Sequence, residues 1–220
     1  MRSRLEVCDD ALDVSSISVP EYWGQAKLEL ASDPILSALF SRFDDSVLSS
    51  DGDLFETLVV SIIGQQISTI AASAVRERLE KLVGKLDPES ILSCSKEELC
   101  SCGLSGMKAE YIAGAARAWM SGYRDIDWES LTDVEVKAKL TALRGVGVWT
   151  AEMVLIFALS RPDVLPLTDL GLIRAVEKHY FDGNEVNTER IEAISDNWAP
   201  WRTVATWYLW RSIDPAPVQY

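Results

Sequence analysis

Apolar side chains recur along this chain at intervals of three and four residues, which is the spacing of one face of an α-helix. Segments with the strict apolar–polar alternation of a half-buried β-strand are scarce. The clearest helical pattern lies in residues 54–74, where the apolar positions are Leu54, Leu58, Val59, Ile62, Ile63, Ile67, Ile70, Ala71 and Ala74. The spacing predicts an all-α fold.

Start and stop residues divide this pattern into short helices. Asp53 with Glu56, and Thr132 with Glu135, have the three-residue spacing of a capping box. Pro88 is typical of a first helical position. Further helices are expected over residues 91–94, 108–120, 149–159, 171–180, 188–197 and 203–211. In total we expect roughly ten or more helices, joined by short loops.

The composition is that of a globular protein. Of the 220 residues, 48% are apolar and 25% are charged, which suffices for one large core or two smaller ones. A disordered chain would be poorer in apolar residues, and a collagen-like chain would need far more than 12 glycines.

Histidine and cysteine usage removes several classes of site. With His179 as the single histidine, a multi-histidine metal site is excluded and a Ser-His-Asp triad would have to include that residue. The cysteines are Cys8, Cys94, Cys100 and Cys102. They have neither a zinc spacing nor a C-x-x-C pair, which is typical of reduced cysteines in a cytosolic protein.

Targeting and membrane segments are not expected. The first fifteen residues carry acidic side chains where a signal peptide needs an apolar run. The longest apolar stretch, around residues 153–159, is too short to cross a bilayer. We therefore expect a cytoplasmic protein that has no membrane partner.

The formal net charge of −13 argues at first against nucleic acid as a partner. The acidity is uneven, however, because residues 1–57 hold 12 acidic and 4 basic side chains. Residues 136–151 contain three basic side chains and no acidic one. We expect a small basic footprint on an acidic body, formed by Lys137, Lys139, Arg144 and Arg174.

A Gly-x-Gly turn joins two predicted helices at Gly145 and Gly147. Glycine permits a positive φ and leaves no side chain between the backbone and an approaching group. Amides at such a turn and at the following helix N-terminus can bind one backbone phosphate. The same turn also fits an ordinary tight helix connection. A dinucleotide-binding fold is excluded because no strand precedes the turn and no third glycine follows at the required spacing.

Four segments, in chain order, give the sequence a resemblance to the helix-hairpin-helix DNA glycosylases, and within them to the alkylated-base (3-methyladenine) enzymes. They are GQQIS at 64–68, LRGVGVWTA at 143–151, PLTDLGLIR at 166–174 and WAPWRTVATWYLWR at 198–211. The resemblance spans roughly residues 54–215. We accordingly predict two helical domains with a helix-hairpin-helix motif and an active cleft between them. One domain covers residues 53–166, and the other combines 1–52 with 167–220.

The resemblance assigns the catalytic aspartate to Asp169. Cleavage of an N-glycosidic bond builds positive charge on the deoxyribose as the base leaves. A nearby carboxylate stabilises that charge and can orient the attacking water. Asp169 is also suited to cap the helix over residues 171–180, and the two roles are compatible.

The resemblance also implies a monofunctional enzyme. Bifunctional members place a Schiff-base lysine in the hairpin at the position of Trp149, and an indole cannot form an imine with C1′. Trp149 could also be a core residue at the start of an apolar helix, and the two interpretations are compatible. The predicted base pocket consists of Trp149, Trp207, Tyr208 and Trp210. Trp210 matches the pocket tryptophan of the alkylated-base enzymes, although most aromatic residues at helical spacing are core residues.

The predicted DNA contacts lie in two segments. The residue that fills the gap left by a flipped base is expected in the Gln65–Ser68 junction, as Gln66 or Ser68. Alternatively, these glutamines satisfy buried backbone groups. The full set of expected DNA-binding residues is Gln65, Gln66, Ser68, Arg144, Gly145, Val146, Gly147 and Thr150.

Many relatives hold a [4Fe–4S] cluster with four cysteines near their C-terminus, and this sequence has no cysteine after Cys102. We expect no cluster, no other cofactor and no metal site built from side chains. Relatives of this kind often bind a monovalent cation through hairpin carbonyls, which side chains do not test.

The sequence thus predicts a monomeric glycosylase that flips and excises alkylated purines of the 3-methyladenine and 7-methylguanine class from double-stranded DNA. One alternative is a non-catalytic protein that binds damaged DNA with the same fold. Another is a glycosylase for a different base, such as hypoxanthine, ethenoadenine or a mismatched pyrimidine.

Overall fold

The computed structural model describes residues 18–50 and 52–214. Over these residues the protein is helical and contains no β-strand, only an isolated bridge between Ser18 and Ser50. The prediction of an all-α fold is confirmed. None of the helices in this part of the chain is both long and apolar enough to cross a membrane.

The helices are mostly short. In chain order they are α1 (Trp23–Leu30), α2 (Pro34–Arg42), α3 (Leu54–Gly64), α4 (Thr69–Val83), α5 (Pro88–Ser93), α6 (Lys96–Ser101), α7 (Gly106–Met120), α8 (Asp133–Thr141), α9 (Val148–Phe157), α10 (Leu170–Tyr180), α11 (Thr188–Ser195) and α12 (Arg202–Ile213). Two 3-10 turns, η1 (Tyr123–Asp125) and η2 (Asp196–Trp198), follow α7 and α11.

Side-chain caps set many of the helix starts. Thr132 and Glu135 form the predicted capping box at α8, and Asp53 caps α3 by accepting a hydrogen bond from the Glu56 amide. Pro88 is the first residue of α5, as predicted. Each such cap stabilises its helix by about 1 kcal/mol. The caps explain why so many short helices are well defined.

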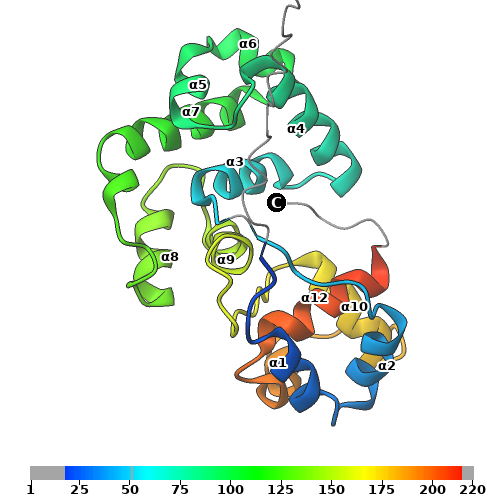
Figure 1. Ribbon diagram of the computed structural model, residues 1–220. Helices are drawn as coiled ribbons and strands as arrows, with labels where there is room; N and C mark the ends of the chain where they lie inside the picture. Colours follow the sequence, from blue (N-terminus) through cyan, green and yellow to red (C-terminus); the bar gives the residue numbers. More distant parts are fainter. Residues whose placement is uncertain (1–17, 51, 215–220) are drawn as a thin grey trace, which may run out of the picture.

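The helices pack in two sets, which Figure 1 shows above and below each other. In the upper set, α3 packs against α4, α7 and α9, while α5 and α6 cover α7, and α8 packs against α9. In the lower set, α12 packs against α1, α2 and α10. The exact domain boundaries at residues 53 and 166 stay a prediction.

Helix α9 is the second helix of the helix-hairpin-helix motif in the upper set, and α8 is the first. Eight of its ten residues are buried, from Thr150 to Phe157, so the helix is enclosed on nearly all sides. Such burial fixes the position of its first turn, where Trp149 is partly exposed. The chain then leaves α9, crosses to the lower set and begins α10 at Leu170.

Candidate active site

Asp169 caps α10, and its carboxylate accepts three hydrogen bonds. Oδ1 accepts from the Leu172 amide and from Trp210 Nε1, each at 2.7 Å. Oδ2 accepts from Trp149 Nε1 at 2.8 Å. The positive end of the α10 dipole further favours a negative charge at this position. The helix cap and the two indoles therefore hold a partly exposed carboxylate in one orientation.

The two indoles come from different sets of helices. Trp149 lies in α9 of the upper set, whereas Trp210 lies in α12 of the lower set and stacks on Phe157 with ring centroids 5.9 Å apart. Both indoles are partly exposed. The predicted site residues Asp169, Trp149 and Trp210 are thus brought together where the two sets meet.

Gly171 makes this close arrangement possible. A Cβ atom at this position would lie 2.9 Å from Asp169 Oδ1 and 3.1 Å from Trp210 Cδ1, inside normal contact distances. A side chain at residue 171 would therefore displace the carboxylate or the indole. Sequence reasoning did not single out this glycine, because its neighbours in space are set by packing.

The structure does not bring Trp207 and Tyr208 to the site. Trp207 is 5% exposed and Tyr208 is fully buried, where it packs against Trp23 and Phe40. Successive residues of a helix point about 100° apart, so residues 207 and 208 face the core while Trp210 faces Asp169. Their predicted place in a base pocket is corrected to a place in the core.

The hairpin between α8 and α9 presents its backbone to solvent. Gly145 has a φ of +86°, and the ring of Tyr111 packs directly against its Cα, so no side chain fits there. Gly147 and Arg144 are exposed, whereas Val146 is buried. No side chain caps the start of α9 at Gly147. The first amides of α9 can therefore bind an anion, as the sequence predicted.

Two of the predicted DNA-binding residues stabilise the hairpin itself. Gln65 Nε2 donates hydrogen bonds to the Gly145 carbonyl and to Thr150 Oγ1, both at 3.0 Å. Thr150 is 2% exposed. For Gln65, the interpretation that the glutamine satisfies buried backbone groups fits this geometry. Contact of these two side chains with DNA is not supported.

Gln66 is one of three exposed residues in the α3–α4 junction, with Ile67 and Ser68. Its φ of +58° turns the chain, and its side chain is exposed. Ser68 is also exposed but caps α4 through the Ala71 amide at 3.3 Å. Lys108, which sequence reasoning missed, donates from Nζ to the carbonyls of Ile63 and Gln65 at 2.8 and 2.7 Å. Among the candidates for the gap-filling residue, the geometry favours Gln66.

Three of the four residues of the predicted basic footprint are exposed, namely Lys139, Arg144 and Arg174. Lys137 is partly buried and lines a cavity of about 520 Å³ together with Glu152. Arg144 remains exposed beside the turn and lies 3.4 Å from Glu110. Arg144 is the basic side chain in the turn itself.

Glu152 is a buried acid that sequence reasoning missed. It lies one helical turn after Trp149 and is 7% exposed. Burial raises its pKa to about 7; Lys137 lowers the pKa and the charge of Asp169 raises it. The indication available in the sequence was that this acid directly precedes the apolar stretch 153–159.

Glu152→Gln should stabilise the protein at alkaline pH. Because the folded-state pKa lies above the unfolded value of about 4.5, ionisation opposes folding, and the penalty builds up as the pH rises from about 4.5 to about 7 and is constant above that. At pH 8 we expect the free energy of unfolding to rise by on the order of 3 kcal/mol, and at pH 5 by less than about 1 kcal/mol. Urea unfolding at both pH values measures the difference.

The matched control is Glu192→Gln, an exposed carboxylate that lines the same cavity. It should change stability by less than about 0.5 kcal/mol at either pH. A gain for Glu152→Gln that is equal at pH 5 and pH 8 would contradict the assignment of an ionisation penalty to this residue.

A comparison with protein families finds a match that includes the site residues just described. Residues 59–200, which include the hairpin and Asp169, match the model of the HhH-GPD superfamily of base excision DNA repair proteins. The chain belongs to this superfamily, which confirms the resemblance seen in the sequence.

Curated relatives include DNA-3-methyladenine glycosylase 1 of Schizosaccharomyces pombe, which is 36% identical over 57% of this chain and 56% of its own length. A DNA-3-methyladenine glycosylase of Bacillus subtilis is 33% identical over 56% of this chain and 41% of its own length. The chain spans about half the length of the curated relatives it matches.

Solved structures give a similar result over more of the chain. The Schizosaccharomyces pombe 3-methyladenine DNA glycosylase in complex with abasic DNA superposes with a TM-score of 0.76 at 28% identity, over 86% of this chain and 96% of that one. The 3-methyladenine DNA glycosylase of Archaeoglobus fulgidus gives 0.74 at 29% identity, over 86% and 68%. A Clostridium acetobutylicum 8-oxoguanine glycosylase/lyase, at 20% identity, shares the fold.

Proposed function

We propose that this protein is a DNA glycosylase that excises alkylated purines of the 3-methyladenine and 7-methylguanine class from double-stranded DNA. The observation that carries the proposal is the Asp169 carboxylate, held by two indole N–H groups and a helix N-terminus beside an exposed hairpin. The names of the relatives in Schizosaccharomyces pombe and Bacillus subtilis support the same substrate class.

The geometry suggests how the groups share the reaction. The hairpin backbone and the first amides of α9 bind a phosphate, which fixes the strand next to Asp169. Gln66 fills the gap when the damaged nucleotide is flipped out. The carboxylate of Asp169 then stabilises the positive charge that develops on the sugar and orients water toward C1′.

Substrate selection is proposed to use both the enzyme and the chemistry of the lesion. Methylation at N3 of adenine or N7 of guanine gives the base a positive charge and weakens its bond to the sugar. The partly exposed rings of Trp149 and Trp210 attract a cationic ring by up to about 2 kcal/mol when water is excluded. A neutral base gains less from the same contact.

We further propose that the enzyme is monofunctional and acts as a monomer without a cofactor. Asp169 and both indoles come from one chain. An indole occupies the hairpin position of the lyase lysine, and the nearby Lys108 donates hydrogen bonds from Nζ to two backbone carbonyls. A Schiff base with C1′ therefore has no amine at the hairpin position.

A base-release assay tests the function. Duplex DNA methylated with dimethyl sulfate should release free 3-methyladenine and 7-methylguanine when the full chain is added, as resolved by chromatography. The strand should break only after alkali treatment, and borohydride should trap no covalent complex. Binding without release would indicate a non-catalytic protein. Release of hypoxanthine or ethenoadenine alone, from matched duplexes, would redirect the substrate class.

A further inference from the structure

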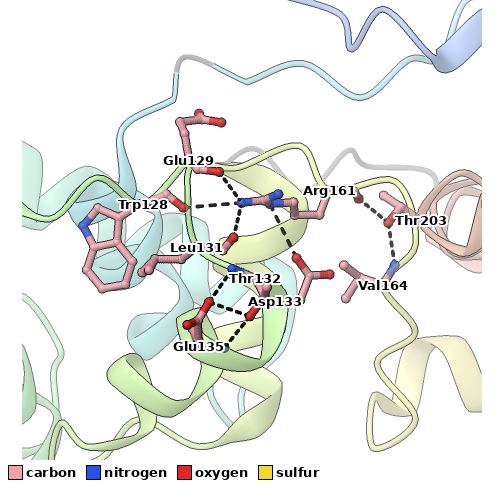
Figure 2. A network of polar contacts seen from close by, with 9 residues as sticks. All are labelled: Trp128, Glu129, Leu131, Thr132, Asp133, Glu135, Arg161, Val164 and Thr203. Atoms are coloured by element: carbon pink, nitrogen blue, oxygen red, sulfur yellow. Dashed lines mark hydrogen bonds and ion pairs between the residues drawn. The ribbon is translucent and has the colours of Figure 1, made fainter.

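The segment between α9 and α10 makes polar contacts in two directions, the first through the side chain of Arg161 (Figure 2). Its Nη2 donates hydrogen bonds to the carbonyls of Trp128, Glu129 and Leu131 at 3.3, 3.0 and 2.8 Å. Its Nε lies 3.5 Å from Asp133 Oδ1. These partners precede α8 or begin it, so Arg161 ties the end of α9 to the start of α8.

The second set of contacts joins the same segment to the start of α12. Asp163 accepts two hydrogen bonds from the Arg202 guanidinium, both at 2.6 Å. The Thr203 hydroxyl donates to the Arg161 carbonyl at 2.6 Å and accepts from the Val164 amide at 3.1 Å (Figure 2). Arg161 therefore binds the start of α8 in the upper set, and Asp163, two residues later, binds the start of α12 in the lower set.

These contacts fix the two elements that carry the indole donors of the active site. The Arg161 side of the segment holds the helix-hairpin-helix motif at the end opposite its turn. The Asp163 side holds α12, which carries Trp210 and thereby one of the donors to Asp169. The other donor, Trp149, stands on α9. Both elements that orient the carboxylate are thus fixed to the same four residues, 161–164.

We infer that Arg161 is a positioning residue, which together with Asp163 holds the helix-hairpin-helix motif at the distance from Asp169 that a bound nucleotide requires. This inference rests on the proposed glycosylase function. Arg161 does not touch the reacting atoms, and it acts by limiting the relative movement of the hairpin and α12. A displacement of about 1 Å between bound strand and carboxylate lowers a reaction rate severalfold to a hundredfold.

The test compares Arg161→Ala with Arg161→Lys and a matched control. A lysine keeps the charge but is a compact donor that cannot replace the planar fork of a guanidinium. Arg124→Ala is the control, because Arg124 also joins two elements of the upper set, through an exposed ion pair with Glu89 at 2.7 Å between η1 and α5, away from the site. Single-turnover release of methylated purines and affinity for undamaged duplex are measured for each full chain, well below its unfolding temperature.

We expect Arg161→Ala to lower the single-turnover rate at least about tenfold and to change DNA affinity less than about threefold. Arg161→Lys should fall between this variant and the wild type, and Arg124→Ala should match the wild type. A rate for Arg161→Ala within about twofold of the wild type would overturn the inference. So would equal losses in Arg161→Ala and Arg124→Ala, since these would report stability alone.

Hydrogen–deuterium exchange separates this inference from the proposed function. The Leu172 amide donates to Asp169, so its exchange reports the position of the carboxylate without any activity. Arg161→Ala should accelerate its exchange together with that of residues 128–137, and an unchanged Leu172 amide would overturn the inference even if the wild type released no base. If Arg161→Ala does not fold, Asp163→Asn replaces it in both measurements, because this variant weakens the contact of the same segment with Arg202 of α12.

Discussion

Asp169→Asn is expected to lower single-turnover release of 3-methyladenine at least about a hundredfold and to leave affinity for duplex DNA nearly unchanged. Asparagine retains an oxygen that can accept from the Leu172 amide and from Trp210, so the cap of α10 can persist. Its NH₂ group would face the Trp149 N–H, and the negative charge would be lost. Chromatographic assay of the released base, with enzyme in excess, measures the effect.

Asp33→Asn is the control for this prediction. Asp33 also caps a helix, accepts from the Ile35 and Leu36 amides and accepts from the Tyr180 hydroxyl at 2.8 Å. It lies in the lower set of helices, outside the group formed by Asp169 and its two indoles. We expect Asp33→Asn to lower the free energy of unfolding and to leave the single-turnover rate of base release unchanged. Asp169→Asn with a rate within about threefold of the wild type would refute the assignment of catalysis to this carboxylate.

Gly145→Ala is expected to destabilise the hairpin and to weaken DNA binding. A left-handed backbone costs a non-glycine residue about 1–3 kcal/mol, and here the new methyl group would also overlap the ring of Tyr111. We expect the free energy of unfolding to fall by about 3 kcal/mol. Because the turn would move or open, the affinity for duplex DNA should fall at least about tenfold. Thermal unfolding and fluorescence anisotropy with labelled duplex measure the two effects.

Gly147→Ala introduces the same methyl group two residues further along the same turn. Gly147 has a φ of −94°, and a Cβ atom there would have no neighbour within 4 Å. We expect its stability to stay within about 0.5 kcal/mol of the wild type. A loss of DNA affinity without a loss of stability in this variant would show that the DNA backbone approaches Gly147 directly. Equal stability of the two variants would contradict the role given to the Gly145 conformation.

Much of the fold and one part of the site could be predicted from local patterns. The period of apolar residues predicted helices, and capping residues placed the starts of α5 and α8, because both effects act between residues at most four positions apart. The capping role of Asp169 is a local feature of the same kind, whereas its catalytic role was predicted from the resemblance to the helix-hairpin-helix DNA glycosylases. The Gly-x-Gly turn was equally visible as a short pattern.

The partners of these residues depend on contacts that no local pattern contains. Trp149, Asp169 and Trp210 are separated by 20 and 41 residues in sequence, and only the packing of α9, α10 and α12 brings their side chains together. The same packing places Trp207 and Tyr208 in the core, although both belong to the tryptophan-rich segment that carries Trp210.

The sequence by itself determined a helical protein with a hairpin and a capping aspartate, because neighbouring residues encode these features, and the resemblance added that an indole stands where bifunctional relatives have a lysine. The tertiary structure decided which indoles hold the carboxylate, why Glu152 resists ionisation and how Arg161 spans two sets of helices. Those properties arise from burial and from hydrogen bonds between distant segments, so they exist only once the chain has packed.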